Sequence, residues 1–297
     1  MLRAGPHIRL SHREPRMPET KQADTEEQKS VSEGLQKDLQ RPSAEDIYEQ
    51  VATNARQELE RSSLALALSG FGAGAFMGLS ALGTAIGIAL LNDSSHARIL
   101  SRMFYPLGFI VVIIGRSQLF TENTLYPVAL VLKEKRQFWN TMRLWVVVLP
   151  TNVLGALAFA TLATHTSAIE PQFVSTMGAL GARAISHPAS TVFWSGVIAG
   201  WMIALAAWLV SASHSVTGSV MVIWMLTYVV GLGDFAHCIA SSCEILTTVL
   251  SHQASWISFF QWFGPAVSGN IIGGVCLVTI LEYGQVIYGS ESAEKER

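Results

Sequence analysis

Two long apolar stretches of this sequence are each interrupted near the middle by residues that do not favour a membrane helix. The first interruption is Gly115 to Thr121, with the sequence Gly-Arg-Ser-Gln-Leu-Phe-Thr. The second is Gly231 to His237, with the sequence Gly-Leu-Gly-Asp-Phe-Ala-His. Non-helical backbone is tolerated at bilayer depth only where protein or a water-filled path satisfies its polar groups. Two broken spans therefore predict a permeation path.

The composition is that of an integral membrane protein. Half of the 297 residues are hydrophobic and only 14% are charged. Charge-free stretches such as 64–91 and 184–233 are long enough for one and two crossings, at about 20 residues each. We predict an all-α membrane protein whose second and fifth spans are broken. Its six transmembrane helices are expected at about 64–91, 100–132, 144–166, 189–212, 219–250 and 256–285.

Charge and cysteine usage exclude several classes of protein. The net charge of −2 argues against a nucleic-acid partner, because proteins that grip phosphates normally present a basic face. Cys238, Cys243 and Cys276 fall in predicted spans without metal-ligand spacing, so we interpret them as small buried hydrophobes. We expect no metal site and no cofactor. The sequence also offers no catalytic pair, so we expect no enzyme.

The distribution of lysine and arginine predicts the orientation in the membrane. Ten of these residues precede the first span, and Lys133, Lys135, Arg136 and Arg143 lie between the second and third spans. Positive loops stay on the cytoplasmic side. We therefore expect a multi-pass protein of the cell inner (plasma) membrane with both termini cytoplasmic.

The ends of the chain differ from its middle. The polar composition of the first residues is typical of disorder; their arginines fit either an organelle targeting peptide or a start at Met17. Ser43, followed by two acids, resembles a helix N-terminus. The predicted parts are a disordered cytoplasmic tail at 1–45, an amphipathic interfacial helix at 46–62, the transmembrane channel or transporter domain at 63–286, and a cytoplasmic tail at 287–297.

A short motif occurs twice in the sequence. Asn152-Val-Leu-Gly155 in the third span recurs as Asn270-Ile-Ile-Gly273 in the sixth. Because each half then has three spans, the second copy enters the membrane from the opposite face, which makes an inverted repeat. The two breaks would meet near the midplane. Each asparagine could hold the broken backbone or offer a donor to a passing anion, and we favour support of the breaks.

Gly70, Gly74 and Gly78 repeat every four residues along the first span. Small residues at this spacing allow close helix packing. This face could seal one half of the protein against the other or join subunits.

The motifs at both breaks, Leu119-Phe120-Thr121 and Phe235-Ala236-His237, together with the two Asn-x-x-Gly spans, resemble the formate/nitrite transporter family. The resemblance covers residues from about 62 to 286. It implies an aquaporin-like fold and a homopentamer with one pore in each subunit. It also implies the passage of small monovalent anions such as formate, nitrite or hydrosulfide.

The same resemblance assigns roles to residues on the substrate path. Thr121 matches the family's loop threonine, and His237 matches its central pore histidine. Leu119 and Phe120 stand where the family narrows its pore on the cytoplasmic side, and Phe235 lies near the histidine.

The chain departs from the family pattern at three places. Arg116 is inserted at the first break, where Gln118 replaces the usual acid. At the second break Ala236 replaces a glutamate. The basic residue that the family places before the fourth span is absent, although Arg183 lies one position away. These differences indicate a divergent branch.

His237 gives the predicted pore a proton-exchanging group. A small anion that enters a dry constriction loses its hydration, so it needs a donor or neutralisation. Histidine has an ordinary pKa of about 6.5 and exchanges protons near physiological pH. A weak-acid anion could take this proton, cross as a neutral molecule and release it beyond. The expected partners are thus a small anion, a proton and the lipid bilayer.

Four charges lie near the breaks: Arg116, Glu122, Asp234 and Glu244. Each costs about 2.5 to 3.5 kcal/mol at the bilayer centre unless it is paired or hydrated. We expect Arg116 to pair with at least one of these acids, and favour Glu244 or Asp234; unpaired, it would attract anions. The alternative function is a pore for a small neutral solute such as water, glycerol or ammonia, but neither break contains Asn-Pro-Ala.

Overall fold

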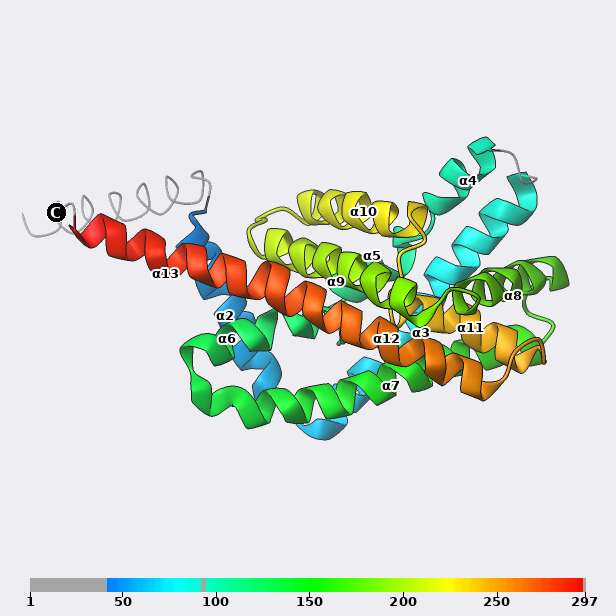
Figure 1. Ribbon diagram of the computed structural model, residues 1–297, viewed down its shortest axis with the longest axis horizontal. Coiled ribbons are helices and arrows are strands. Elements are labelled where there is room, and N and C mark those ends of the chain that lie inside the picture. The colour runs from blue at the N-terminus through cyan, green and yellow to red at the C-terminus, as the bar shows by residue number, and fades with distance from the viewer. Residues whose placement is uncertain (1–41, 92–94, 296–297) are drawn as a thin grey trace, which may run out of the picture. The chain divides into compact units, whose positions relative to one another are not determined.

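The computed structural model describes residues 42–91 and 95–295, and every regular element within these ranges is helical (Figure 1). Residues 1–41 of the expected tail lie outside this part of the chain. The α-helices are α2 Ala44–Glu60, α3 Ser63–Leu91, α4 Ser95–Arg102, α5 Pro106–Ile114, α6 Tyr126–Lys133, α7 Phe138–His165, α8 Pro171–Ile185, α9 Ala189–Ser211, α10 Val216–Leu232, α11 Ala240–Leu250, α12 Trp256–Gly274 and α13 Ile280–Lys295. A 3-10 turn at Glu122–Thr124 precedes α6, and a π-helical segment at Val275–Thr279 joins α12 to α13.

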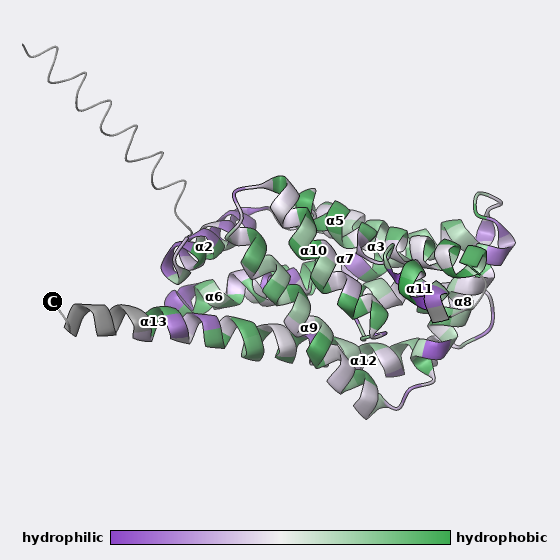
Figure 2. Cartoon of the chain, turned by 90° about the horizontal axis from the view of Figure 1, so that it is seen from above, coloured by the Kyte–Doolittle hydropathy of each residue, from purple (hydrophilic) through white to green (hydrophobic). Residues whose placement is uncertain are grey.

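The helices fit the predicted plan of whole and broken spans. Five stretches among the described residues are long and apolar enough to cross a membrane: 63–91, 96–114, 135–165, 189–211 and 256–288. The fifth span of the prediction is divided into two shorter apolar helices, α10 and α11. The second span is divided into α5 and α6. Figure 2 shows that these helices are mostly hydrophobic, whereas α2 is largely hydrophilic.

The repeat predicted from the Asn-x-x-Gly motifs is present in the packing. In the first half α3 packs against α7, and in the second half α9 packs against α12. The helices after each break pack across the halves: α11 contacts α3 and α7, while α6 contacts the π-helical segment and α13. The second half-helix of each broken span thus packs against the opposite half of the protein. This packing across the halves brings the two breaks together.

Glycines permit the closest helix contacts within each half. A Cβ on Gly74 of α3 would overlap the carbonyl oxygen of Asn152 in α7, and a Cβ on Gly200 of α9 would overlap that of Asn270 in α12. The glycine face of α3 therefore packs against α7 within the first half, rather than against the second half as in the first of the two roles expected for it. Gly78 belongs to the same contact and faces the ring of Phe159.

We predict that Gly74→Ala destabilises the protein by about 1 to 3 kcal/mol, because the added methyl group meets backbone that cannot move aside. The midpoint of thermal unfolding in detergent measures the effect. Gly72→Ala on the same helix is the matched control, since its Cβ would lie 3.6 Å from the Phe76 ring, an ordinary contact. Equal unfolding temperatures for the two variants would contradict the assigned packing.

Two helices were not predicted, and the break limits differ from expectation. α4 and α8 are short, and they lie in connections that were expected to be loops. The second break begins at Gly233 rather than Gly231, because Gly231 still belongs to α10. Gly231 instead faces Tyr105, whose ring leaves no room for a Cβ.

α2 lies against the protein through specific contacts. Its N-terminus has the capping box of Ser43 and Asp46 that the sequence indicated, although the helix covers 44–60 rather than 46–62. Tyr48 donates a hydrogen bond to the carbonyl oxygen of Ala129 in α6, at 2.9 Å. Arg56 pairs with Glu134 at 2.8 Å. Hydrogen bonds from Arg56 and Arg136 lower the pKa of the Glu134 carboxyl.

Candidate substrate path

Both breaks begin with the same helix-ending motif. After α5, the N–H of Arg116 bonds to the carbonyl of Ile113 at 3.3 Å, and that of Ser117 to Val112 at 3.0 Å. After α10, the N–H of Asp234 bonds to the carbonyl of Gly231 at 3.2 Å, and that of Phe235 to Val230 at 3.0 Å. This pattern is a Schellman motif, which satisfies carbonyls that a helix end leaves free.

The residue that usually occupies the turning position of this motif is glycine, but here it is charged in both copies. Arg116 has φ 56° and Asp234 has φ 52°. The left-handed conformation costs a residue with a Cβ roughly 1 to 2 kcal/mol. Strain of this kind is concentrated at functional sites. The two breaks thus present an arginine and an aspartate at equivalent positions.

Asn152 holds the backbone of the first break. Its side-chain oxygen accepts the N–H of Phe120 at 2.9 Å, and its amide donates to the carbonyls of Gln118 at 2.8 Å and Gly70 at 2.7 Å. The hydroxyl of Ser69 accepts the N–H of Gln118 at 3.1 Å. The side chain is fully buried, so water does not replace these bonds.

Asn270 repeats this arrangement at the second break. Its oxygen accepts the N–H of Cys238 at 2.8 Å, and its amide donates to Ala236 and Gly196, each at 2.8 Å. Ser195 takes the place of Ser69 and accepts the N–H of Ala236 at 2.9 Å. Both asparagines therefore support the breaks. The serines were missed, although the sequence Ser-Gly-x-x-Ala-Gly recurs at 69–74 and 195–200.

The two breaks meet through a hydrogen bond between Thr121 and His237. The Thr121 hydroxyl oxygen lies 2.8 Å from Nε2 of His237, and both side chains are fully buried. Nδ1 of His237 accepts the N–H groups of Ile239 at 3.3 Å and Ala240 at 3.1 Å, at the start of α11. Because Nδ1 is an acceptor, the neutral ring carries its hydrogen on Nε2 and directs it at Thr121.

Two aromatic side chains form a row of ring contacts that begins at His237. The Phe109 ring meets His237 edge-on at 4.9 Å between centroids, and Tyr105 lies 5.5 Å from Phe109. The buried hydroxyl of Tyr105 has no hydrogen-bond partner among the described residues. Neither aromatic residue was singled out in the sequence, because both stand in an apolar run that resembles ordinary core.

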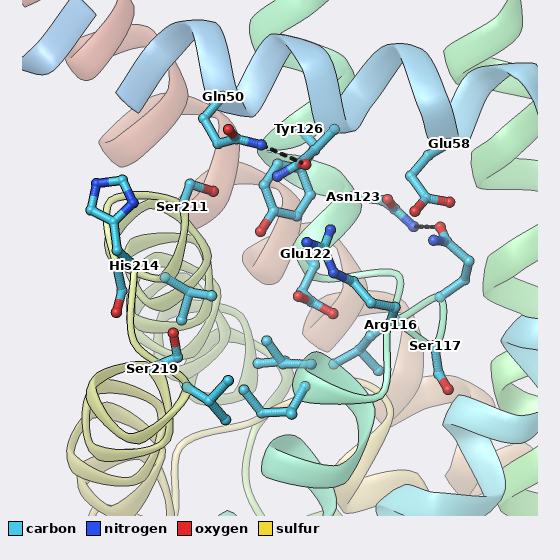
Figure 3. A pocket seen from close by; sticks show the side chains of 18 of the residues that line it. Gln50, Glu58, Arg116, Ser117, Glu122, Asn123, Tyr126, Ser211, His214 and Ser219 are labelled. Atoms are coloured by element: carbon cyan, nitrogen blue, oxygen red, sulfur yellow. Dashed lines mark hydrogen bonds between the residues drawn. The ribbon is translucent and has the colours of Figure 1, made fainter. Parts of the chain in front are cut away.

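A cavity of about 390 Å³ lies against α2, whose Gln50 and Glu58 are among its lining residues (Figure 3). Leu119 lines it next to the first break, as do Arg116 and Glu122. The view shows Arg116 and Glu122 reaching into the same space. The predicted pairing of Arg116 with Asp234 or Glu244 is wrong, because both of those acids line a different cavity. Arg116 forms no ion pair within the described ranges.

Two further cavities lie on the α8 side, with volumes of about 40 Å³ and 270 Å³. Asp234 and Phe235 line both of them, and Glu244 lines the smaller one. The basic partners of Asp234 come from the two helices that were not predicted: Arg98 and Arg102 of α4, and Arg183 of α8. The convergence of these arginines depends on the two helices that were not predicted.

Comparison with known proteins fits this arrangement. The family model described as "Formate/nitrite transporter" matches residues 45–284. The chain belongs to the formate/nitrite transporter family. It is 33% identical to the inner membrane protein YfdC of Escherichia coli over 248 residues, which cover 81% of this chain and 78% of YfdC. It is 25% identical to the formate channel FocA of Haemophilus influenzae, over 62% of this chain and 73% of FocA.

Solved structures support the same fold. A chain titled "FNT family ion channel" superimposes with a TM-score of 0.71 at 19% identity and covers 80% of this chain and 97% of its own length. A "Pentameric formate channel with formate bound" gives a TM-score of 0.66 at 21% identity, over 76% and 97%. These likenesses show that the chain has the all-helical membrane fold of these channels.

Phe120, like Thr121 and His237, lines none of the three cavities. Its ring packs edge-on against Trp145, 5.5 Å between centroids. Trp145 in turn donates to the carbonyl of Asn123 at 2.9 Å. In this conformation the Phe120 ring packs the first break against α7.

Proposed function

We propose that the chain conducts small monovalent weak-acid anions, such as formate, nitrite or hydrosulfide, as a channel or a proton-coupled transporter. The single observation that carries this proposal is the buried Thr121–His237 hydrogen bond, at 2.8 Å, between breaks contributed by opposite halves. The first cavity is lined by residues of α2 and α6 and the other two by residues of α4 and α8, and His237 lines none of the three. The substrate would thus cross a dry constriction, the waist, at the Thr121–His237 pair.

The waist favours substrates that can be neutralised. Leu119, Phe109 and Phe235 are apolar groups near it, so an unpaired anion would lose hydration worth several kcal/mol there. Thr121 and the Nε2–H of His237 supply neutral donors instead of a fixed charge. A weak acid that crosses in its protonated form avoids this cost.

Net proton transfer at His237 requires a balanced exchange on the ring. As the Nε2 proton passes, by way of the Thr121 hydroxyl, to the anion, a proton from bulk water must reach Nδ1, so that the ring stays neutral and ends as its other tautomer. The gain at Nδ1 displaces the N–H groups of Ile239 and Ala240, which bond to it at 3.3 and 3.1 Å. Proton coupling would therefore open the first turn of α11. This step links the substrate path to a movement of the second break.

The assembly and orientation are parts of the same proposal. A related solved structure is titled as a pentameric formate channel, which supports a homopentamer with one path in each subunit. The cluster of lysine and arginine between α6 and α7 supports a cytoplasmic position for that loop and for both termini. The relative YfdC is an inner membrane protein, which supports the same membrane for this chain. We propose transport without catalysis of a covalent step.

Flux into liposomes tests the function. Purified protein should carry formate and nitrite inward, and the internal pH should fall as formate enters. Empty liposomes and liposomes with heat-denatured protein are the controls. Glycerol or water permeation without anion flux would reject the proposal in favour of a neutral-solute pore.

A further inference from the structure

Three guanidinium groups converge on the carboxylate of Asp234. Nη2 of Arg98 lies 3.4 Å from this carboxylate, Nη2 of Arg183 lies 3.2 Å from it, and Arg102 also forms an ion pair with it. One negative charge thus faces three positive charges. The only other acid that lines these cavities within the described residues, Glu244, has no basic nitrogen within salt-bridge distance. The arginine cluster therefore keeps an excess of positive charge.

The cluster lies where the two α8-side cavities adjoin. Asp234 and Arg183 line both cavities, Arg102 lines the smaller one and Arg98 the larger one. Arg102 is only 5% exposed, and its Nε–H has no partner among the described residues. A buried donor without a partner is costly, so this arginine is suited to a further acceptor.

The pairs with Arg98 and Arg183 are weak enough to exchange. The side chains of these arginines are 54% and 55% exposed, and exposed ion pairs typically contribute about 1 kcal/mol or less. A carboxylate or nitrite has the same planar pair of oxygens as the Asp234 side chain, which guanidinium binds through two parallel hydrogen bonds. An incoming anion could therefore take the place of Asp234.

We propose that Asp234 is a tethered counter-anion, which competes with the incoming substrate for Arg98, Arg102 and Arg183. It thereby sets the affinity of the two α8-side cavities for the substrate anion. Its left-handed backbone, at φ 52°, holds the carboxylate at the edge of the break rather than within a helix. The inference rests on the proposed function, because it assumes a small planar oxyanion as substrate. In this proposal the Asp234 carboxylate gives way when the anion binds the arginines and displaces the anion when it is released.

The test compares KM and maximal rate for formate in proteoliposomes. Asp234→Asn is expected to lower KM about fivefold, the equivalent of about 1 kcal/mol for an exposed pair, and to lower the maximal rate because release slows. Asparagine tolerates the left-handed conformation, so the backbone of the break is preserved. Arg183→Gln is expected to raise KM, as is Arg98→Gln. A purely structural role for the cluster would change the amount of folded pentamer but not KM in opposite directions.

Glu170→Gln is the matched control, because it removes one acidic charge from the exposed connection before α8 without contacting these arginines. A fall in KM in this control equal to that of Asp234→Asn would overturn the proposal. So would an unchanged or raised KM in Asp234→Asn. If that variant does not assemble, unchanged KM values in both exposed arginine variants overturn it. Failure of the wild-type protein to carry any weak acid would reject the proposed function instead.

Discussion

Replacing Asn270 with alanine is expected to destabilise the folded protein by about 3 kcal/mol or more, because three buried backbone groups lose their partner and each costs about 1 to 3 kcal/mol. These groups are the N–H of Cys238 and the carbonyls of Gly196 and Ala236. Water cannot replace the side chain, since Asn270 is fully buried. The second break would no longer be held in its observed conformation.

The measurement is the unfolding midpoint of the detergent-purified protein, together with the yield of assembled protein by size-exclusion chromatography. Asn152→Ala should behave alike, because Asn152 makes the same three bonds at the first break. Asn140→Ala is the control in α7. Among the described residues, its amide donates only to Gln137, at 2.8 Å, on the exposed surface. Wild-type stability of Asn270→Ala would show that the break does not depend on this support.

Replacing His237 with asparagine is expected to reduce weak-acid flux by about tenfold or more, as the loss of a proton-transfer group typically does. The flux that is left should no longer vary with pH through titration of this side chain. The asparagine oxygen can accept the N–H groups of Ile239 and Ala240 in place of Nδ1, because asparagine is a good helix N-cap. The variant therefore keeps the start of α11 while losing the titratable ring. Folding and proton exchange are separated by this design.

His237→Ala provides the comparison, since it removes both the cap and the ring. We expect it to unfold at a lower temperature than His237→Asn, whereas the two variants should share the loss of pH dependence. The readout is the initial rate of formate-driven acidification inside liposomes at a series of external pH values. Flux in His237→Asn with the wild-type pH profile would exclude the histidine as the proton-coupling group.

The sequence was sufficient for the plan of the fold. Long apolar stretches located the spans, and glycine with polar and charged residues inside two of them located the breaks to within a few residues. The recurring Asn-x-x-Gly motif predicted the repeat, because Asn152 and Asn270 must satisfy equivalent backbone groups. These features depend on residues that are close together in the sequence, so they can be identified from the sequence alone.

The charge network could not be predicted in the same way. Asp234 was expected to meet Arg116, because both stand in the breaks. In the structure they occupy equivalent positions of the inverted repeat, and the cavities that they line are different. The partners of Asp234 lie on α4 and α8, which were expected to be loops. Pairing between distant side chains depends on how helices pack, which a single sequence does not record.

The hydrogen bond between Thr121 and His237 has a consequence for biogenesis. Its two residues are separated by 116 positions and belong to halves that are synthesised one after the other. Neither half alone contains the complete waist, so a ribosome-bound chain that has inserted only α3 to α7 holds a broken span without its mate. The Thr121–His237 hydrogen bond therefore forms only when the C-terminal half docks, and selective conductance would be the last event of maturation.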